Sequence, residues 1–196
     1  MPKTVKQVIE EHQQILLPII KKYIEKKTLL DVGCGNGLNS FFFNKKCGTI
    51  PTLTDIEDIR DKEVISFPFY ISSMEELSFG TGSFDVVFIQ YILHHLPPKI
   101  RLKEVLLELK KIGKIVIIVE EIRTAKTNLQ KAIEYDTEMN KLLHPSSKNM
   151  EIYAYYSDNE LKELFSKAHL EIIEEKIIEE GSEKDGFLQN KVYVLK

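Results

Sequence analysis

Short apolar runs alternate with segments of helical pattern along this 196-residue chain. The apolar runs have the length and near-continuous hydrophobicity of buried parallel strands, and they cover residues 29–32, 49–54, 67–71, 84–90 and 114–122. Helices are predicted between and around them, at residues 3–27, 38–46, 97–112, 127–143 and 158–168. Two last apolar runs, at 170–178 and 187–195, flank a charged turn and predict a closing hairpin.

This alternation predicts an α/β fold with a parallel sheet, and a chain of this length is expected to form one domain. Residues 57–65 leave little room for the usual crossover helix, so we expect a single turn or a stunted helix there. Pro18 is expected to kink or split the first helix, because proline cannot donate the helical hydrogen bond. The run Ser157-Asp158-Asn159-Glu160 is a capping box that opens the last helix.

The stretch TLLDVGCGNGL, residues 28–38, predicts a strand, a tight glycine turn and the start of a helix. Such a cradle suits a nucleotide-like ligand. Its spacing is not the dinucleotide fingerprint, which would need a third glycine at Leu38, nor a P-loop, which would need Lys followed by Ser or Thr. Asp55 ends the next strand, 18 residues after Gly37, where an acidic residue suits ribose hydroxyls. The alternatives for that role are Glu57 and Asp58.

The pattern D-x-G-x-G-x-G from Asp31 to Gly37 resembles motif I of the class I S-adenosylmethionine-dependent methyltransferases. FDVVFIQ at 84–90 resembles their motif IV, and SSMEELSF at 72–79 resembles their adenine-binding D-A-E-E-L-P-F segment. The resemblance covers about residues 28–195. It implies a Rossmann-like, seven-stranded, mostly parallel sheet with helices on both faces, in the strand order 3-2-1-4-5-7-6 with strand 7 antiparallel.

The resemblance also implies S-adenosyl-L-methionine as the cofactor. Asp31 and the glycine backbone would approach its amino-acid end, Asp55 its ribose, and Gln90 its methionine portion. Ser73 and Met74 stand at the adenine edge, where the family often has Asp and Ala. Cys34 is expected to be a small loop residue rather than a nucleophile. The implied cofactor-binding residues are Asp31, Gly33, Cys34, Gly35, Gly37, Asp55, Ile56, Ser73, Met74 and Gln90.

Candidate acceptor-side residues follow the fourth and fifth strands. His94 and His95 lie where the resembled fold builds its substrate mouth, and either could be a base near neutral pH or be structural. One of Glu120 and Glu121 would face the crevice and could hold a cationic substrate. Tyr91 would face the same crevice.

Residues 123–156 are expected to form a cover over the substrate site, because the connection is longer than most. Its candidate lining residues, for which ordinary packing is the alternative, are Tyr135, Asp136, His144, Tyr153 and Tyr155.

Charge and composition narrow the function class. A net charge of −3 argues against a dedicated nucleic-acid binder, which needs clustered Lys and Arg. Two cysteines give no disulfide framework, and neither a signal peptide nor a long apolar run is evident, so we expect a cytoplasmic setting and no membrane partner. No further Cys or His has the spacing of metal ligands, so no metal site is expected, and His12 is expected to pack within the first helix's apolar stripe.

These observations favour a small-molecule methyltransferase, monomeric or homodimeric, with one domain over residues 1–196, a helical segment at 1–27 and the cover at 123–156. No stable complex with nucleic acid is expected. The alternatives are a methyltransferase acting on protein or tRNA, and a catalytically inactive S-adenosylmethionine-binding subunit.

Overall fold

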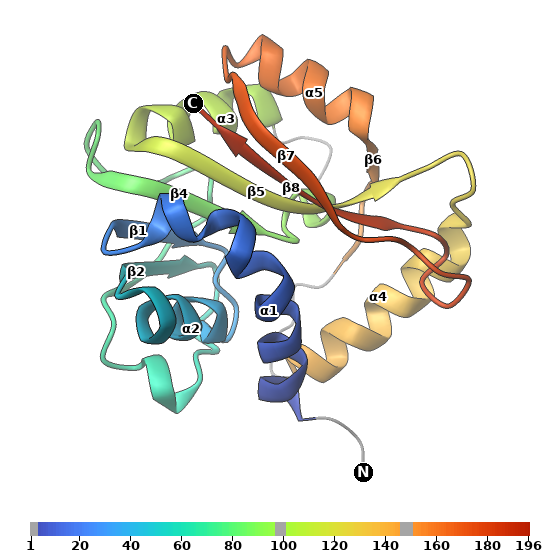
Figure 1. Ribbon diagram of the computed structural model, residues 1–196, viewed down its shortest axis with the longest axis horizontal. Coiled ribbons are helices and arrows are strands. Elements are labelled where there is room, and N and C mark those ends of the chain that lie inside the picture. The colour runs from blue at the N-terminus through green and yellow to red at the C-terminus, as the bar shows by residue number, and fades with distance from the viewer. Residues whose placement is uncertain (1–3, 97–100, 146–150) are drawn as a thin grey trace.

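The computed structural model describes residues 4–96, 101–145 and 151–196. A central sheet carries helices on both faces (Figure 1). Its strands are β1 (Thr28–Val32), β2 (Ile50–Asp55), β3 (Phe69–Ile71), β4 (Phe84–Gln90), β5 (Gly113–Arg123), β6 (Tyr156–Ser157), β7 (Ile172–Glu179) and β8 (Gln189–Leu195).

The strand order is β3-β2-β1-β4-β5-β8-β7, with β6 paired to β5. The order expected for the seven main strands is confirmed, and β8 is antiparallel to both of its neighbours. The sheet has eight strands rather than the seven expected. The extra strand, β6, is only two residues long and pairs with the far end of β5, and two residues carry no periodic signal.

The helices lie close to their predicted positions. They are α1 (Val5–Ile24), α2 (Leu38–Cys47), α3 (Leu102–Ile112), α4 (Leu129–Leu143) and α5 (Asp158–Lys167), with 3₁₀ turns η1 (Lys62–Val64) and η2 (Leu93–His95). The turn η1 is the stunted element expected between β2 and β3. Residues 97–100 of the predicted helix 97–112 lie outside the described residues, as do residue 3 of the first helix and 146–150 of the cover.

Helix α1 runs unbroken through Pro18, so the predicted split is wrong. Pro18 is exposed, and the carbonyl that its missing N–H leaves free can therefore bond to water. The capping box that opens α5 is confirmed, since Ser157 and Glu160 bond to each other's backbone N–H groups.

Each face of the sheet has its own core. Helix α1 packs on one face, where Leu16, Ile20 and Ile24 meet Val192 and Val194 of β8. Helices α3 and α5 cover the opposite face.

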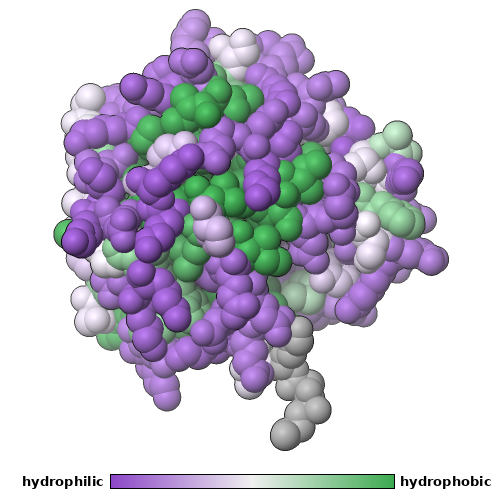
Figure 2. Space-filling model, in the orientation of Figure 1, coloured by the Kyte–Doolittle hydropathy of each residue, from purple (hydrophilic) through white to green (hydrophobic). Residues whose placement is uncertain are grey.

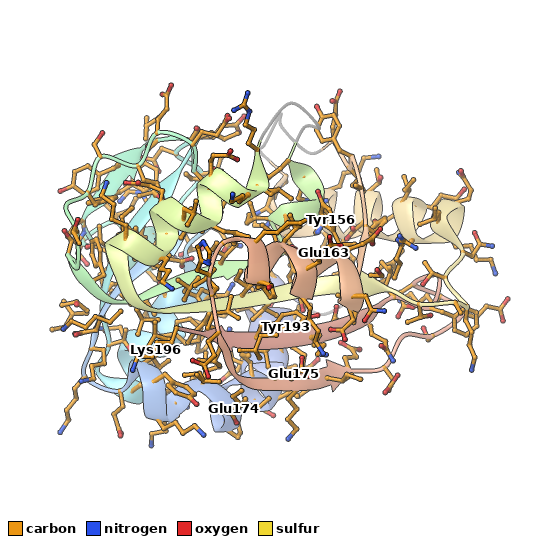
Figure 3. The ribbon with its side chains drawn as sticks, turned by 90° about the horizontal axis from the view of Figure 1, so that it is seen from above. Tyr156, Glu163, Glu174, Glu175, Tyr193 and Lys196 are labelled. Atoms are coloured by element: carbon orange, nitrogen blue, oxygen red, sulfur yellow. The ribbon has the colours of Figure 1, made fainter. Side chains whose placement is uncertain are left out.

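Successive side chains of the edge strand β7 point alternately to the two faces of the sheet (Figure 3). Glu174 accepts a hydrogen bond from Tyr23 of α1, whereas Glu175 pairs with Lys162 of α5. The period-two pattern therefore directs successive β7 side chains to opposite layers.

Some apolar surface lies on the face that carries α1, β7 and β8 (Figure 2). Ile15 of α1 and Ile173 and Ile177 of β7 are among the exposed large apolar side chains. None of the described helices combines the length and apolar composition that crossing a membrane requires.

Candidate active site

The glycine loop joins β1 to α2 and is tied to the end of β2. Gly33, Gly35 and Gly37 have φ values of +68°, +55° and +74°, a region that glycine enters at little steric cost. The Gly33 N–H donates to the Thr54 carbonyl at 2.8 Å, and the Gly35 N–H donates to Asp55 Oδ2 at 2.7 Å. Asp55 therefore lies directly against the loop, at the carboxyl end of its strand.

Two side chains of the motif are buried and so are closed to a ligand in the loop. Asp31 is 3% exposed and accepts a hydrogen bond from Ser40 Oγ at 2.7 Å. Burial raises the pKa of Asp31 to about 7, although the Ser40 bond opposes this. The Cys34 thiol packs with Leu53 and Val64, and burial raises its pKa, so it stays protonated. Only the backbone of Cys34 remains available to a ligand in the loop.

The residues predicted at the adenine end differ in exposure. Ile56 follows Asp55 and is 51% exposed, so its side chain is free to pack on a planar ring. Ser73 Oγ accepts a hydrogen bond from the Glu75 N–H at 3.1 Å and so stabilises its own turn. The Met74 side chain is buried in the core below, which leaves its backbone at this edge.

The carboxyl end of β4 contacts α1 through polar groups. Tyr91 has a φ of +54°, which is strained for a residue with a Cβ. His12 Nε2 lies 2.8 Å from Tyr91 Oη, and its Nδ1 lies 3.4 Å from Gln90 Nε2. Burial lowers the pKa of His12 to about 4, so the ring is neutral. The sequence assigned His12 to packing, and nothing local signals that its partners are Gln90 and Tyr91.

His94 forms a buried pair with Glu120. His94 is 1% exposed and Glu120 is 0% exposed, and His94 Nδ1 donates to Glu120 Oε1 at 2.6 Å. The other carboxylate oxygen accepts the Leu93 N–H at 2.8 Å. Burial alone would lower the pKa of His94, but Glu120 and Asp136 outweigh it and raise the pKa to about 9. In this form His94 is a cation at neutral pH and does not accept a proton there.

Two more buried acids lie next to this pair. Asp136, on α4, accepts the Tyr155 hydroxyl at 2.6 Å and lies 3.5 Å from His94 Nε2. Glu121 is 8% exposed, and burial together with the neighbouring Asp136 carboxylate raises its pKa well above the ordinary value. The Tyr155 ring stacks on the His94 ring. Thus both glutamates at the end of β5 belong to one buried cluster, which the cover closes.

Of the two adjacent histidines, His94 and His95, the second is neutral. Its Nδ1–H donates to the Glu151 carbonyl at 2.8 Å, and its Nε2 lies 3.4 Å from the Asn140 amide nitrogen of α4. Burial and the charge on His94 lower the pKa of His95. Its Nε2 lone pair therefore faces the cover and is basic only weakly.

The end of α4 lies on the glycine loop. Asn36 Nδ2 donates to the Leu143 carbonyl at 3.2 Å. A Cβ built on Gly35 would lie 2.5 Å from His144 Cε1. His144 Nδ1 is buried without a partner among the described residues, and burial lowers the pKa of His144 to about 4. The structure thus brings His144 to the loop, and Figure 1 shows α4 running toward the N-terminal part of α1.

Two predicted lining residues lie elsewhere on the cover. Tyr153 is 42% exposed and its hydroxyl bonds to Glu151, two residues away. Tyr135 is half-buried beside Lys184, whose Nζ lies 5.5 Å from the ring centre. Among the described residues, neither side chain forms a hydrogen bond to the His94 cluster. The backbone N–H of Tyr153 does reach that region, because it donates to the His94 carbonyl at 2.8 Å.

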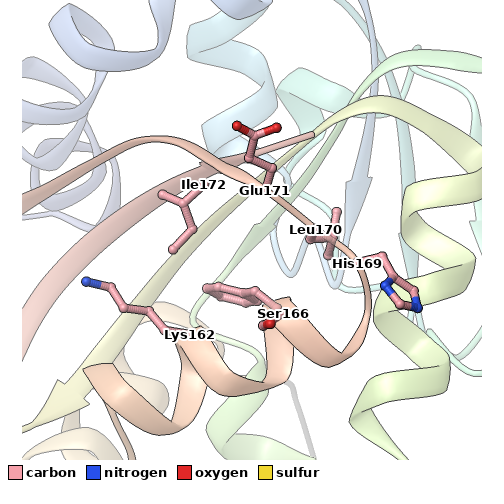
Figure 4. Close-up of a pocket in the computed structure, with 7 residues that line it drawn as sticks. Lys162, Ser166, His169, Leu170, Glu171 and Ile172 are labelled. Atoms are coloured by element: carbon pink, nitrogen blue, oxygen red, sulfur yellow. The ribbon is translucent and has the colours of Figure 1, made fainter.

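A separate surface hollow lies between α5 and the start of β7, lined in part by Lys162, His169 and Glu171 (Figure 4). Ile172 pairs with Leu195, which pairs with Val116 near the start of β5. The hollow is therefore at the amino ends of the parallel strands, on the opposite edge from the glycine loop. Ligands of open α/β sheets bind at the carboxyl ends, so the hollow is not the candidate site.

Two features at the carboxyl ends of the strands suit a nucleotide-like cofactor. The first is the loop of three left-handed glycines with Asp55 against it. Gln90 Oε1 is buried without a hydrogen-bond partner in the part of the chain that the structure describes. A buried polar atom of this kind is costly unless a ligand or water bonds to it.

Comparison with protein families gives a match to the methyltransferase domain model over residues 30–117. These residues run from β1 into β5 and include the glycine loop, Asp55 and His94. A search among curated proteins finds no match.

Solved structures share the fold along nearly the whole chain. An S-adenosylmethionine-dependent methyltransferase from Methanosarcina mazei has a TM-score of 0.70 at 21% identity, covering 91% of this chain and 96% of that one. The 1,6-didemethyltoxoflavin N1-methyltransferase of Burkholderia thailandensis, solved with 1,6-didemethyltoxoflavin and S-adenosylhomocysteine, has a TM-score of 0.67 at 16% identity, covering 97% and 78%. The geranyl diphosphate C-methyltransferase of Streptomyces coelicolor, solved with Mg²⁺, geranyl diphosphate and S-adenosyl-L-homocysteine, has a TM-score of 0.68 at 13% identity, covering 98% and 83%.

The glycine loop, the strand order and the domain match agree with one another. The chain therefore carries a match to the methyltransferase domain over residues 30–117 and has the fold of solved S-adenosylmethionine-dependent methyltransferases.

Proposed function

We propose that this enzyme transfers a methyl group to a small-molecule acceptor held between the carboxyl ends of β4 and β5 and the cover at 123–156. The observation that carries the proposal is the contact of the cover with the glycine loop, where Leu143 and His144 lie on Asn36 and Gly35. A cover in this position makes the acceptor side small and enclosed. The toxoflavin and geranyl diphosphate enzymes, which share the fold, bind small organic acceptors according to their names.

The cofactor would lie along the carboxyl ends of β1, β2 and β4. Backbone N–H groups of the glycine loop would face its amino-acid end, Asp55 its ribose, and the unpartnered Gln90 Oε1 its polar atoms. Ile56 would cover the adenine ring from the solvent side. The implied edge residues Ser73 and Met74 would contribute backbone groups more than side chains, because one side chain is bonded in its own turn and the other is buried.

When bound, S-adenosylmethionine supplies an activated methyl group, so the protein needs no covalent nucleophile of its own. What the chain must provide is alignment, which can lower a barrier by roughly 7–11 kcal/mol. His12, Tyr91 and Gln90 form a bonded set that fixes the end of β4. The buried pair of His94 and Glu120 fixes the segment that follows. For an acceptor that must lose a proton, His95 is the neutral histidine, since His94 is already protonated, and His95 Nε2 would exchange the Asn140 amide for the acceptor.

A macromolecular acceptor is less well supported. RNA would need a continuous basic face, and on α4 Lys131 and Lys141 alternate with Glu134 and Glu138. Lys131 is also paired with Glu183.

The test is a screen with a labelled methyl donor against metabolite fractions, bulk tRNA and protein extract. We expect label in a small molecule. Shortening residues 126–144 to a glycine-rich link should abolish that transfer while leaving cofactor binding, measured by calorimetry, nearly intact. Label in tRNA or protein alone, transferred equally by the shortened enzyme, would overturn the proposal. No label in any fraction would favour a cofactor-binding subunit without activity.

Point variants give a gentler test of the cover. Asn140→Ala removes the α4 side chain that reaches His95 Nε2, and it should lower transfer. Gln130→Ala is the matched control, because Gln130 lies in the first turn of the same helix and its amide donates to Glu134. Equal activity of the two variants would contradict a role for this face of α4.

A further inference from the structure

We propose that His94, Glu121 and Asp136 form a binding site for a divalent metal ion of the Zn²⁺ or Mn²⁺ type. They come from three separate elements, since His94 lies in η2, Glu121 in β5 and Asp136 in α4. All three residues are buried, and one ligand atom from each lies within 4.8 Å of the other two. No spacing along the sequence announces the site, because 26 residues or more separate His94 from the acids.

The distances suit a metal ion after a small movement. Ligand atoms about 2.1 Å from a tetrahedral ion lie about 3.4 Å apart. His94 Nε2 and Asp136 Oδ2 are already 3.5 Å apart. The Glu121 carboxylate is within 4.8 Å of both, so a side-chain rotation is enough to complete the set.

A buried atom without a partner points to a missing ligand. Glu121 is 8% exposed, and its Oε2 has no hydrogen-bond donor among the described residues. The carboxyl group beside Glu121 belongs to Asp136, and the two groups can hydrogen-bond to each other only while one of them holds a proton. A buried carboxylate facing another carboxylate is costly, and a cation between them would satisfy both.

Neighbouring side chains orient the proposed ligands through hydrogen bonds, as is usual around metal sites. A histidine that binds a metal typically donates its other ring N–H to a carboxylate, and here His94 Nδ1–H donates to Glu120 at 2.6 Å. That bond leaves Nε2 directed at Asp136, and a bound metal ion would take the place of the proton that Nε2 carries without it. A ligating carboxylate is commonly hydrogen-bonded in turn, and Tyr155 donates to Asp136 at 2.6 Å.

The ligand set decides the kind of ion. One imidazole and two carboxylates suit Zn²⁺ or Mn²⁺ better than Mg²⁺, which prefers oxygen ligands and keeps its waters. Three protein ligands leave a position open on a four-coordinate ion, as in catalytic zinc sites. That position could take an oxygen of the methyl acceptor. This role rests on the proposed function, whereas the metal site itself does not.

The experiment is a calorimetric titration of the full-length protein with Mn²⁺ and with Zn²⁺, after removal of metals by a chelator and without any methyl donor. We expect one ion bound per chain for each metal and at least 10-fold weaker binding of Mg²⁺. Glu121→Gln keeps the shape of the side chain and mimics the protonated acid, so it should fold normally yet lose at least 10-fold in Mn²⁺ affinity. Glu120→Gln should lose about 10–100-fold, as expected for a group that orients a ligand. Glu108→Gln is the charge-matched control, because Glu108 pairs with Lys111 on the surface of α3, far from the proposed ligands in the fold. The Mn²⁺ affinity of this variant should be unchanged.

Three results would overturn the proposal. The first is no saturable Mn²⁺ or Zn²⁺ binding by the unmodified protein, which would mean that Glu121 and Asp136 simply share a proton. The second is unchanged affinity in both Glu121→Gln and Asp136→Asn, with folding checked by circular dichroism. The third is equal affinity for Mg²⁺, which would remove His94 from the ligand set. Since the titration contains no methyl donor, none of these results would bear on methyl transfer.

Discussion

Replacing Gly35 by alanine tests whether the cover lies on the glycine loop in solution. The added Cβ meets two obstacles in the structure. Gly35 has a φ of +55°, and the Cβ would stand 2.5 Å from His144 Cε1 and 3.0 Å from His144 Nδ1. Ordinary contacts between such atoms are about 3.5–4.0 Å, so either His144 or the loop must move by an ångström or so.

The two obstacles have separable costs. A left-handed backbone costs about 1–2 kcal/mol for a residue with a Cβ. If the backbone at His144 moves together with its ring, the bond from Asn36 to the Leu143 carbonyl, worth about 1 kcal/mol, is lost as well. Gly35→Ala should therefore lower the free energy of unfolding by about 2–3 kcal/mol in the natural chain. In a His144→Ala background, the same change should cost only the backbone share, about 1–2 kcal/mol.

The assay is urea unfolding followed by circular dichroism for the four proteins of this cycle. Gly82→Ala is the control, because Gly82 has a φ of +66° and a Cβ there would meet nothing within 4 Å. It should show the backbone cost alone and no coupling to His144. A coupling between Gly35 and His144 below about 0.3–0.5 kcal/mol, the level of independent sites, would refute the placement of α4 on the loop.

Three further predictions concern the cofactor, the loop cysteine and acid stability. Asp55→Ala should weaken S-adenosylmethionine binding, measured by calorimetry, by roughly 1–3 kcal/mol, because a buried hydrogen-bonding partner is lost; unchanged affinity would move the ribose role to a neighbouring acid. Cys34→Ala should keep most methyl transfer, since the thiol is protonated and packed in the core; loss of turnover with normal cofactor binding would contradict this. Burial raises the pKa of Asp158, but hydrogen bonds from Lys191, Tyr193 and Lys162 outweigh it and lower the pKa to about 2, from an ordinary value of 3.8. The ionised form therefore stabilises the fold by about 1–2 kcal/mol above pH 4, and this is lost as the pH falls toward 2. Unfolding curves of the natural chain and Asp158→Asn should differ at neutral pH and converge near pH 2, and a constant difference would be the contrary result.

The sequence by itself determined the order of the elements and the place of the glycine loop. Glycines at positions 33, 35 and 37 predict a tight turn with positive φ, and all three residues adopt positive φ in the structure. The apolar runs predicted the strands to within a few residues, because a buried parallel strand needs continuous hydrophobicity. The exceptions follow from the same limits. The two residues of β6 are too few to show a period. The sequence pattern also does not show that the helical hydrogen bond missing at Pro18 falls on the exposed side of α1, where the helix tolerates its loss.

Only the tertiary structure decided which buried polar groups meet. Periodicity reports that a side chain is buried, not what lies against it, and the partners here come from distant segments. His12 on α1 reaches Tyr91, 79 residues away, and His94 reaches Glu120, 26 residues away. The roles of the two histidines after β4 were open in the sequence. Their pKa values separate because Glu120 and Asp136 outweigh the effect of burial on His94, whereas burial and the charge on His94 lower the pKa of His95. Electrostatic environment depends on distance through space, and no local pattern along the chain encodes it.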